Sequence, residues 1–341
     1  MPVKFGTSGL RGLVTEMPAE IIALYTNAFL KACHIEHTLC VARDLRPSSK
    51  RIAGDIIREA LTLGLRVLDC GTLPTPALAL FAHSKNAGAI MVTGSHIPSD
   101  RNGLKFYTPQ GEITKDDETE ITAQLHRKTP KNTKKSMPKN CYEEAQQLFK
   151  DRYIKTFGPK ALFGKRIGIY AHSAVGRDLL GDILSGLGAE VTEFGRSETF
   201  IAVDTEAVDA TTRRQIQTWV QAHALDAIVS TDGDSDRPLL ADETGTLVPG
   251  DILGQITAKA LGSHTVVTPI SSNSAVLQKG FSKVLRTKIG SPYVIAAMQE
   301  HSDGTVGYEA NGGFILGFHA KAPTGLIAPL LTRDCVLPLV T

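Results

Sequence analysis

Residues Gly88 to Lys105, GAIMVTGSHIPSDRNGLK, give the clearest indication of the fold. The first part of this stretch, Ala89 to Val92, is a short apolar run typical of a strand buried inside a sheet. Polar residues follow directly, and in open α/β folds the loops at the carboxyl ends of strands carry the chemistry. Ser95 in this loop is a candidate nucleophile. A Ser- and Pro-rich surface loop without chemistry is the alternative that this segment alone leaves open.

The rest of the segment indicates how the loop closes. Gly94 permits a tight turn or a close approach to a phosphate. The pair Asn102-Gly103 predicts a two-residue turn that reverses the chain. This turn would return Lys105 toward Ser95 and His96, so that a serine, a histidine and a lysine share one site.

The composition is that of a globular protein with several domains. At about 150 residues per domain, 341 residues predict two or three domains, and a hydrophobic share of 42% supplies their cores. The formal net charge of +2 gives no reason to expect a nucleic-acid partner. The five cysteines lack CxxC spacing, which favours reduced thiols in a cytoplasmic protein. No apolar run reaches membrane-spanning length, so we expect no membrane segment.

Strand and helix patterns alternate along the chain, which predicts parallel βαβ units. The alternation occurs three times, and we expect an α/β fold of three consecutive domains with mixed, mainly parallel sheets around a central cleft. The expected domain bounds are 1–140, 141–248 and 249–341. Residues 126–140 contain six Lys or Arg, two Pro and no acid. We interpret them as a solvated linker rather than a phosphate-binding patch.

The N-terminal segment Gly6–Gly12, GTSGLRG, is rich in glycine and carries one arginine. Its backbone N–H groups and the Arg11 guanidinium could together hold an anion. A flexible terminal turn is the other interpretation of the same residues.

An acidic loop follows the apolar run Ala227–Val229. Asp232, Asp234 and Asp236 place three carboxylates at i, i+2 and i+4, where they can converge on one divalent cation. Mg²⁺ fits best, because it takes oxygen ligands and usually keeps a coordination place for a phosphate oxygen. Three clustered carboxylates repel one another unless a cation compensates them, which argues against a bare acidic turn.

Two rival interpretations of the acidic loop lead to other chemistry. An EF-hand needs glycine at its sixth position and helices on both sides, whereas the sixth position here is Arg237, the seventh is Pro238, and strands flank the loop. An aspartyl-phosphate phosphatase would use Asp232 as its nucleophile. That alternative leaves Ser95 without a role.

Together these segments resemble the α-D-phosphohexomutase superfamily, particularly its phosphomannomutase and phosphoglucomutase branches. The family's serine loop, T-A/S-S-H-N-P, is similar to Thr93–Pro98, with Gly94 and Ile97 as departures. Its metal loop, D-G-D-x-D-R, is matched in full by Asp232–Arg237. The opening residues Lys4–Gly12 also look like the family's N-terminus, and the resemblance covers the whole chain.

The family's sugar-recognition loop, commonly G-E-x-S-G-H, is a further match. Glu309 stands at its glutamate, Asn311 at its serine, Gly312 at its glycine and Gly313 at its histidine. The resemblance implies that Glu309 and Asn311 hydrogen-bond sugar hydroxyls, with Gly312 in the same substrate-binding loop. Because the histidine is missing, the choice of sugar and the acid or base of this loop stay open.

The resemblance implies a phosphohexomutase that interconverts hexose 1-phosphate and hexose 6-phosphate, of mannose, glucose or both. Phosphorylated Ser95 would donate its phosphoryl group to the hexose monophosphate, and the resulting hexose 1,6-bisphosphate, which is also the activator, would reorient and return its other phosphate. Mg²⁺ on the three aspartates would also bind a phosphoserine oxygen of Ser95. Arg11, Lys105 and Arg237 would offset charge on the transferring oxygens.

Proton transfer in this scheme falls to His96 or Lys105. Lys105 is preferred, because neighbouring cations make a lysine a better proton donor.

The resemblance also implies four domains, of which this chain would supply three. No phosphate loop of the form R-x-S-G/N-T-E-P follows Ala320, and Thr332–Asp334 looks like a helix start. We therefore expect a truncated and poorly active mutase. The alternatives are a non-catalytic fragment that binds sugar phosphate and metal, and a phosphoglucosamine mutase. The oligomeric state stays open.

Overall fold

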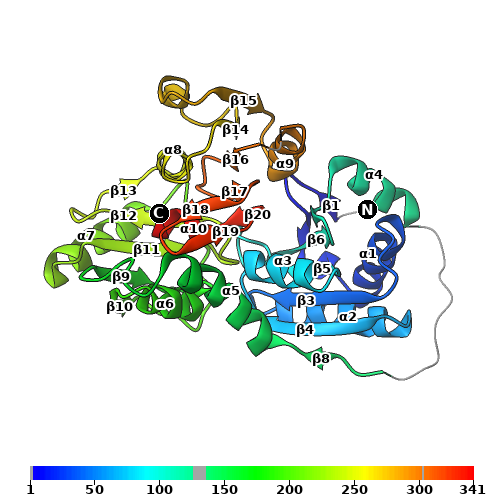
Figure 1. The fold of residues 1–341 in the computed structure, drawn as a ribbon. Coiled ribbons are helices and arrows are strands. Elements are labelled where there is room, and N and C mark those ends of the chain that lie inside the picture. The colour runs from blue at the N-terminus through cyan, green and yellow to red at the C-terminus, as the bar shows by residue number, and fades with distance from the viewer. Residues whose placement is uncertain (1–2, 126–135, 302) are drawn as a thin grey trace.

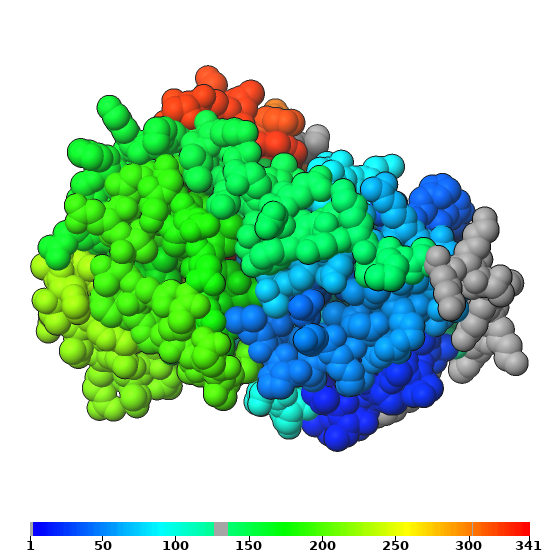
Figure 2. Space-filling view, turned by 90° about the horizontal axis from the view of Figure 1, so that it is seen from below, coloured from blue at the N-terminus to red at the C-terminus, as the bar shows by residue number. Residues whose placement is uncertain are grey.

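The computed structural model describes residues 3–125, 136–301 and 303–341. Figure 1 shows three α/β regions that follow one another from blue through green to orange and red. Seen from below, the green residues lie directly against the blue ones (Figure 2), where helices α3 (Thr75–Ser84) and α5 (Tyr142–Phe157) pack together. The expected α/β fold of three domains with mixed sheets is confirmed.

The first sheet joins a parallel part to an antiparallel part, in the order β1-β2-β6-β5-β3-β4-β8 with β7 paired to β6. The strands β3, β4, β5 and β8 are parallel, and β6, β2, β1 and β7 continue the sheet as antiparallel pairs. Their bounds are β1 (Lys4–Phe5), β2 (Leu10–Leu13), β3 (Thr38–Arg43), β4 (Arg66–Thr72), β5 (Gly88–Val92), β6 (Arg101–Thr108), β7 (Gly111–Glu112) and β8 (Lys139–Asn140).

Strand β5 is apolar throughout because both of its faces are covered. Ile90 and Val92 belong to the hydrophobic cluster on one side of the sheet, whereas Ala89 and Met91 belong to the cluster on the other side. All four side chains are fully buried. Since successive side chains of a strand point to opposite faces, a strand between two layers of helices needs this unbroken apolar run.

The second and third sheets repeat one order, β10-β9-β11-β12-β13 and β15-β14-β16-β17-β20. In each, three parallel strands are followed by antiparallel strands at one edge. A small hairpin of β18 and β19 stands apart. Their bounds are β9 (Arg166–Tyr170), β10 (Glu190–Phe194), β11 (Ala227–Thr231), β12 (Pro238–Ala241), β13 (Leu247–Val248), β14 (Thr265–Pro269), β15 (Lys283–Thr287), β16 (Thr305–Tyr308), β17 (Phe314–Leu316), β18 (Ala320–Ala322), β19 (Gly325–Ile327) and β20 (Leu330–Asp334).

Helices fill the connections between the strands. None of the helices within the described ranges is long and apolar enough to cross a membrane. Besides α3 and α5 they are α1 (Ala19–Ala32), α2 (Ser49–Thr62), α4 (Lys115–Gln124), α6 (Arg177–Gly186), α7 (Ala210–His223), α8 (Gly250–Ala260), α9 (Ser291–Gln299) and α10 (Leu337–Val340), with short 3₁₀ helices at Val14–Glu16 and Ser274–Gln278.

The shared strand order places the three polar loops at equivalent positions. In every sheet the loop leaves the last parallel strand, β5, β11 or β16, and leads into its antiparallel neighbour, β6, β12 or β17. The serine loop, the acidic loop and the sugar-recognition loop therefore sit at the same carboxyl edge of their respective sheets, where α/β folds hold ligands.

Two local expectations are wrong, each because pairing within a sheet overrides a short sequence signal. Asn102-Gly103 is not a turn, since both residues lie within β6 opposite β2. The chain reverses earlier, where the Arg101 N–H donates to the Pro98 carbonyl. Thr332–Asp334 belongs to β20 and not to a helix, and α10 begins only at Leu337. Asp334 Oδ1 accepts hydrogen bonds from the N–H groups of Val336 and Leu337.

The predicted linker lies partly outside the described residues, which omit 126–135. Near the end of this segment, within the described residues, Lys139–Asn140 form β8 and pair with β4 at the edge of the sheet. The N-terminal segment is not a flexible turn, because β1 and β2 form a hairpin that joins the sheet through β6. The domain bounds expected from the sequence stay a prediction.

Candidate active site

Ser95 lies in the loop after β5 and has an uncommon backbone conformation. Its φ is +56°, in the left-handed region that non-glycine residues rarely adopt, and the residue is 1% exposed. Its N–H donates to the Thr93 hydroxyl at 2.7 Å, which fixes the turn. Its own hydroxyl donates to Asp232 Oδ2 at 2.5 Å. Strain of this kind clusters at functional sites, and here it directs the serine at the acidic loop.

Arg46 organises the serine loop, although no sequence pattern marks it. Its fully buried guanidinium is paired with Asp44 at 3.1 Å and stacks on Phe200 of the second domain, 4.1 Å from the ring centre. A Cβ on Gly94 would lie 2.6 Å from Arg46 Cζ, so the glycine makes room for the guanidinium. The remaining N–H groups donate to four loop carbonyls, those of Ser95, Ile97, Pro98 and Arg101.

We expect Arg46→Lys to lower the free energy of unfolding by about 3 kcal/mol, because a lysine cannot donate to four carbonyls and a carboxylate, and buried carbonyls would lose their partners. Chemical denaturation measures this. Arg43→Lys is the matched control, since Arg43 on β3 makes only a long, partly exposed ion pair with Asp69 at 3.9 Å, and we expect it to change stability by less than about 0.5 kcal/mol. Equal effects of the two substitutions would contradict the role of Arg46.

Asp232, Asp234 and Asp236 occupy the loop between β11 and β12, and each is at most 1% exposed. One oxygen from each carboxylate lies within 4.8 Å of the others. Asp232 Oδ1 accepts from the backbone N–H groups of Asp236 and Arg237, which fixes the loop. Their burial excludes a solvated acidic turn, and the flanking strands exclude an EF-hand.

The acidic loop fits a divalent cation. Asp234 Oδ1 and Asp236 Oδ1 are buried without a hydrogen-bond partner, an arrangement that is costly unless a ligand completes it. Burial, together with the neighbouring carboxylates, raises the pKa of Asp232 to about 8. Burial also raises the pKa of Asp236, but the surrounding cations outweigh it and bring that pKa below its usual range. Oxygen ligands of this kind suit a hard cation such as Mg²⁺.

Lys105 and Arg11 bring positive charge to the aspartates from the first domain. The Lys105 ammonium on β6 lies 2.6 Å from Asp234 Oδ2 and 2.5 Å from Asp236 Oδ2. Its immediate charged partners are therefore carboxylates, and Arg333 donates to the same Asp236 oxygen. Arg11 on β2 interacts with the same two carboxylates over a longer range, and burial with the nearby Arg237 lowers the pKa of Arg11.

His96 and Arg237 form a second contact between the serine loop and the acidic loop. Arg237 Nη1 donates to His96 Nδ1 at 3.0 Å, and the same ring nitrogen lies 3.2 Å from the Ser95 hydroxyl oxygen. Burial and the Arg237 guanidinium lower the pKa of His96 to about 4. His96 is therefore neutral at pH 7 and presents a lone pair at Nδ1.

The sugar-recognition loop is folded on itself and held against the second domain. Asn311 Oδ1 accepts from the Gly313 N–H at 2.9 Å, and the Asn311 carbonyl accepts from the Thr205 hydroxyl at 3.0 Å. Gly312 has a φ of +86°, and a Cβ there would lie 2.9 Å from Pro238 at the start of β12. The glycine is thus required both by conformation and by the close approach of the acidic loop.

Arg333 on β20 is a second side chain of the site that no sequence pattern marks. Its guanidinium lies between two loops, 2.7 Å from Asp236 Oδ2 and 3.0 Å from Glu309 Oε2. A helix was expected at this position, so no local signal connected the arginine with the site. The structure thus brings together all the residues predicted for the site, with Arg46 and Arg333 added.

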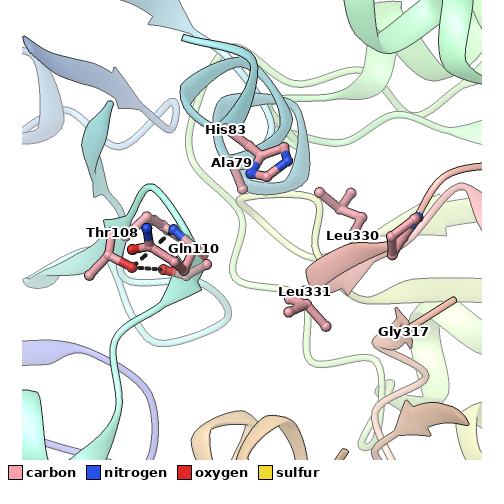
Figure 3. Close-up of a pocket in the computed structure, with 10 residues that line it drawn as sticks. Ala79, His83, Thr108, Gln110, Gly317, Leu330 and Leu331 are labelled. Atoms are coloured by element: carbon pink, nitrogen blue, oxygen red, sulfur yellow. Dashed lines mark hydrogen bonds between the residues drawn. The ribbon is translucent and has the colours of Figure 1, made fainter. Parts of the chain in front are cut away.

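A separate cavity of about 170 Å³ lies between the first and third domains, near α3, the β6-β7 turn and β20. Figure 3 shows His83 and Ala79 on one side and Leu330 and Leu331 on another. The residues that line it include none of those predicted for the site: Ala79, His83, Tyr107, Thr108, Gln110, Gly111, Gly317, Pro329, Leu330 and Leu331.

Comparison with known proteins supports one family across nearly the whole chain. Models of phosphoglucomutase/phosphomannomutase alpha/beta/alpha domains I, II and III match residues 2–132, 151–245 and 242–337. A phosphomannomutase of Sinorhizobium fredii is 45% identical over 354 residues, which cover 100% of this chain and 75% of the relative. A phosphomannomutase of Salmonella muenchen is 45% identical over 345 residues, which cover 99% of this chain and 72% of the relative.

Solved structures show the same fold. A phosphoglucomutase/phosphomannomutase family protein from Burkholderia thailandensis superimposes with a TM-score of 0.77 at 19% identity, covering 95% of this chain and 74% of that one. Fold, site and relatives together define an enzyme of the isomerase class, an intramolecular phosphotransferase. The chain belongs to the phosphoglucomutase/phosphomannomutase family.

Proposed function

We propose that the protein interconverts mannose 1-phosphate and mannose 6-phosphate, with Ser95 as the phosphoryl carrier. The observation that supports this assignment most strongly is the contact between the Ser95 hydroxyl and Asp232 Oδ2 at 2.5 Å, which joins the candidate nucleophile to the candidate metal loop across two domains. Two relatives at 45% identity bear the name phosphomannomutase, which favours mannose over glucose.

In this proposal the hydroxyl of Ser95 carries the phosphoryl group between two positions of one hexose. The phosphoserine P–O bond breaks as a sugar hydroxyl attacks phosphorus, and the hydroxyl proton passes to the departing serine oxygen, which gives a hexose 1,6-bisphosphate and a free serine. After the bisphosphate reorients, the Ser95 hydroxyl attacks its other phosphate, the bond between that phosphorus and the sugar oxygen breaks, and the serine proton passes to the departing sugar oxygen. Asp232 accepts the hydrogen bond of the free serine hydroxyl and so holds the serine oxygen at the acidic loop.

The surrounding residues position the phosphoryl group and balance its charge. Asp232, Asp234 and Asp236 would hold Mg²⁺, which supplies Lewis-acid stabilisation of phosphate oxygens when bound. Lys105, Arg11 and Arg237 add fixed positive charge at the same centre.

The sugar is the part of the substrate that the third domain would bind, through Glu309 and Asn311. His96, neutral and hydrogen-bonded by Arg237, orients groups beside Ser95 and is not the proton donor at neutral pH. Because all five cysteines are unpaired, as in a reducing compartment, we place this activity in the cytoplasm.

Turnover of mannose 1-phosphate, followed by ³¹P NMR with Mg²⁺ and a trace of hexose 1,6-bisphosphate, tests the proposal. We expect mannose 6-phosphate to form, and glucose 1-phosphate to react more slowly under the same conditions. Exclusive conversion of glucosamine 1-phosphate would contradict the assignment of the sugar and leave the phosphoserine mechanism intact.

A further inference from the structure

Arg333 joins the acidic loop of the second domain to the sugar-recognition loop of the third. Its Nε and Nη2 donate to Asp236 Oδ2 at 3.1 and 2.7 Å, and its Nη1 donates to Glu309 Oε2 at 3.0 Å. The residue is 3% exposed. A planar guanidinium divided between two carboxylates fixes the direction of both, because charge-assisted hydrogen bonds are short and directional.

Gly313 leaves the space that the Arg333 side chain occupies. A Cβ at position 313 would lie 2.5 Å from Arg333 Cδ and 2.8 Å from its Cγ, well inside contact distance. The arginine cannot swing aside without breaking its bonds to Asp236 and Glu309. Gly313 does not have a positive φ, so the position needs glycine for space and not for conformation.

We propose that Arg333 is a positioning residue for the sugar-recognition loop. Its side chain, which extends from β20, occupies the space that a histidine would take at position 313 in the family pattern. The proposal rests on the function proposed above, in which Glu309 binds sugar hydroxyls. Arg333 fixes the Glu309 carboxylate and connects it to Asp236. Sugar binding by Glu309 and the position of the Asp236 carboxylate therefore both depend on this one side chain. Gly313 and Arg333 then form a pair that must change together.

A double-mutant cycle of Arg333→Ala, Gly313→His and the combined variant tests the pairing. Calorimetric binding of mannose 6-phosphate, kcat and KM for mannose 1-phosphate, and thermal unfolding are measured for each. We expect R333A to weaken binding and raise KM about ten- to hundredfold with a smaller change in kcat, as when a charge-assisted hydrogen bond is lost. G313H should lose as much or more, because its side chain collides with Arg333. The combined variant should regain at least about tenfold over G313H.

Arg152→Met is the matched control for the loss of a buried arginine. Arg152 lies 4.0 Å from Asp334, the neighbour of Arg333 in β20, and donates to the Ala328 carbonyl, away from both loops. We expect R152M to lower the melting temperature and to leave KM and sugar-phosphate binding within twofold. If R333A does not fold, Arg333→Lys replaces it in the cycle. This variant keeps the positive charge but has a single donor nitrogen, and we expect it to raise KM about tenfold.

Mannose 6-phosphate affinity and KM within twofold of wild type in R333A or R333K would overturn the proposal. A combined variant whose fold-loss in affinity equals the product of the two single fold-losses would also overturn it, because the two positions would then act independently. Wild type and Ser95→Ala are measured alongside. If wild type binds mannose 6-phosphate and does not turn over mannose 1-phosphate, the proposed function fails, while the binding cycle still decides the role of Arg333.

Discussion

Ser95→Ala is expected to abolish mutase turnover, lowering kcat by at least about 10⁴-fold, because no other hydroxyl takes the place of a removed nucleophile. In the structure the Ser95 hydroxyl contacts Asp232 at 2.5 Å, and the strained φ of +56° holds it in that direction. The substitution keeps the backbone and the buried Cβ. A coupled assay with mannose 1-phosphate measures the loss.

Ser235→Ala is the matched control for this substitution. Ser235 has the same φ of +56° and is fully buried, but its hydroxyl contacts Thr231 and the Gly176 N–H at 2.8 and 2.9 Å and not an aspartate. Any loss of activity that comes merely from replacing a buried serine with a positive φ should therefore occur in both variants. We expect S235A to stay within about tenfold of wild type. Turnover in S95A equal to that in S235A would show that another residue is the nucleophile, and Asp232 would be the first candidate.

The second large effect is expected from Asp234→Asn, which removes one negative charge from the acidic loop without changing its shape. We expect Mg²⁺ binding, measured by titration calorimetry, to be lost, and kcat/KM to fall on the order of a thousandfold, since a bound divalent ion supplies several kcal/mol of transition-state stabilisation. The reason lies in the buried Asp234 Oδ1, which has no protein partner and is left for the metal.

Glu243→Gln separates this site from a calcium loop. Glu243 stands where an EF-hand would place its bidentate ligand, yet it is exposed in the turn after β12. We expect E243Q to bind Mg²⁺ as wild type does. Loss of metal binding in E243Q with retention in D234N would contradict the assignment of the ligands.

Much of the fold follows from signals that are local in the sequence. The alternation of apolar strands with amphipathic helices is sufficient to predict three α/β domains, because strands covered on both faces read as unbroken apolar runs such as Ala89–Val92. The acidic loop is equally local. Its three aspartates alternate with Gly233 and Ser235 in one short segment, and their mutual repulsion points to a cation without knowledge of any distant partner.

The misjudged parts depend on contacts between distant segments. Asn102-Gly103 has the composition of a turn, but pairing of β6 with β2 and β5 keeps it extended. The contacts of the Lys105 ammonium with Asp234 and Asp236 arise from the packing of the first domain on the second, which no local pattern indicates. Tertiary contacts of this kind override short-range propensity.

Arg46 and Arg333 could not be found from local patterns for the same reason. Each is a single arginine in an ordinary segment, and its function arises from carbonyls or carboxylates up to 97 residues away in sequence. The one available signal for Arg333 is indirect. Glycine at position 313, where the family pattern has histidine, marks a space that some other side chain must fill.

The most direct test of the account is peptide mass spectrometry of the purified protein after incubation with mannose 1,6-bisphosphate and Mg²⁺. We predict a gain of about 80 Da, the mass of one phosphoryl group, on the peptide that contains Ser95, and no such gain in S95A. Phosphate on the Asp232 peptide, or an unmodified Ser95 peptide from protein that turns over mannose 1-phosphate, would contradict the claim that Ser95 carries the phosphoryl group.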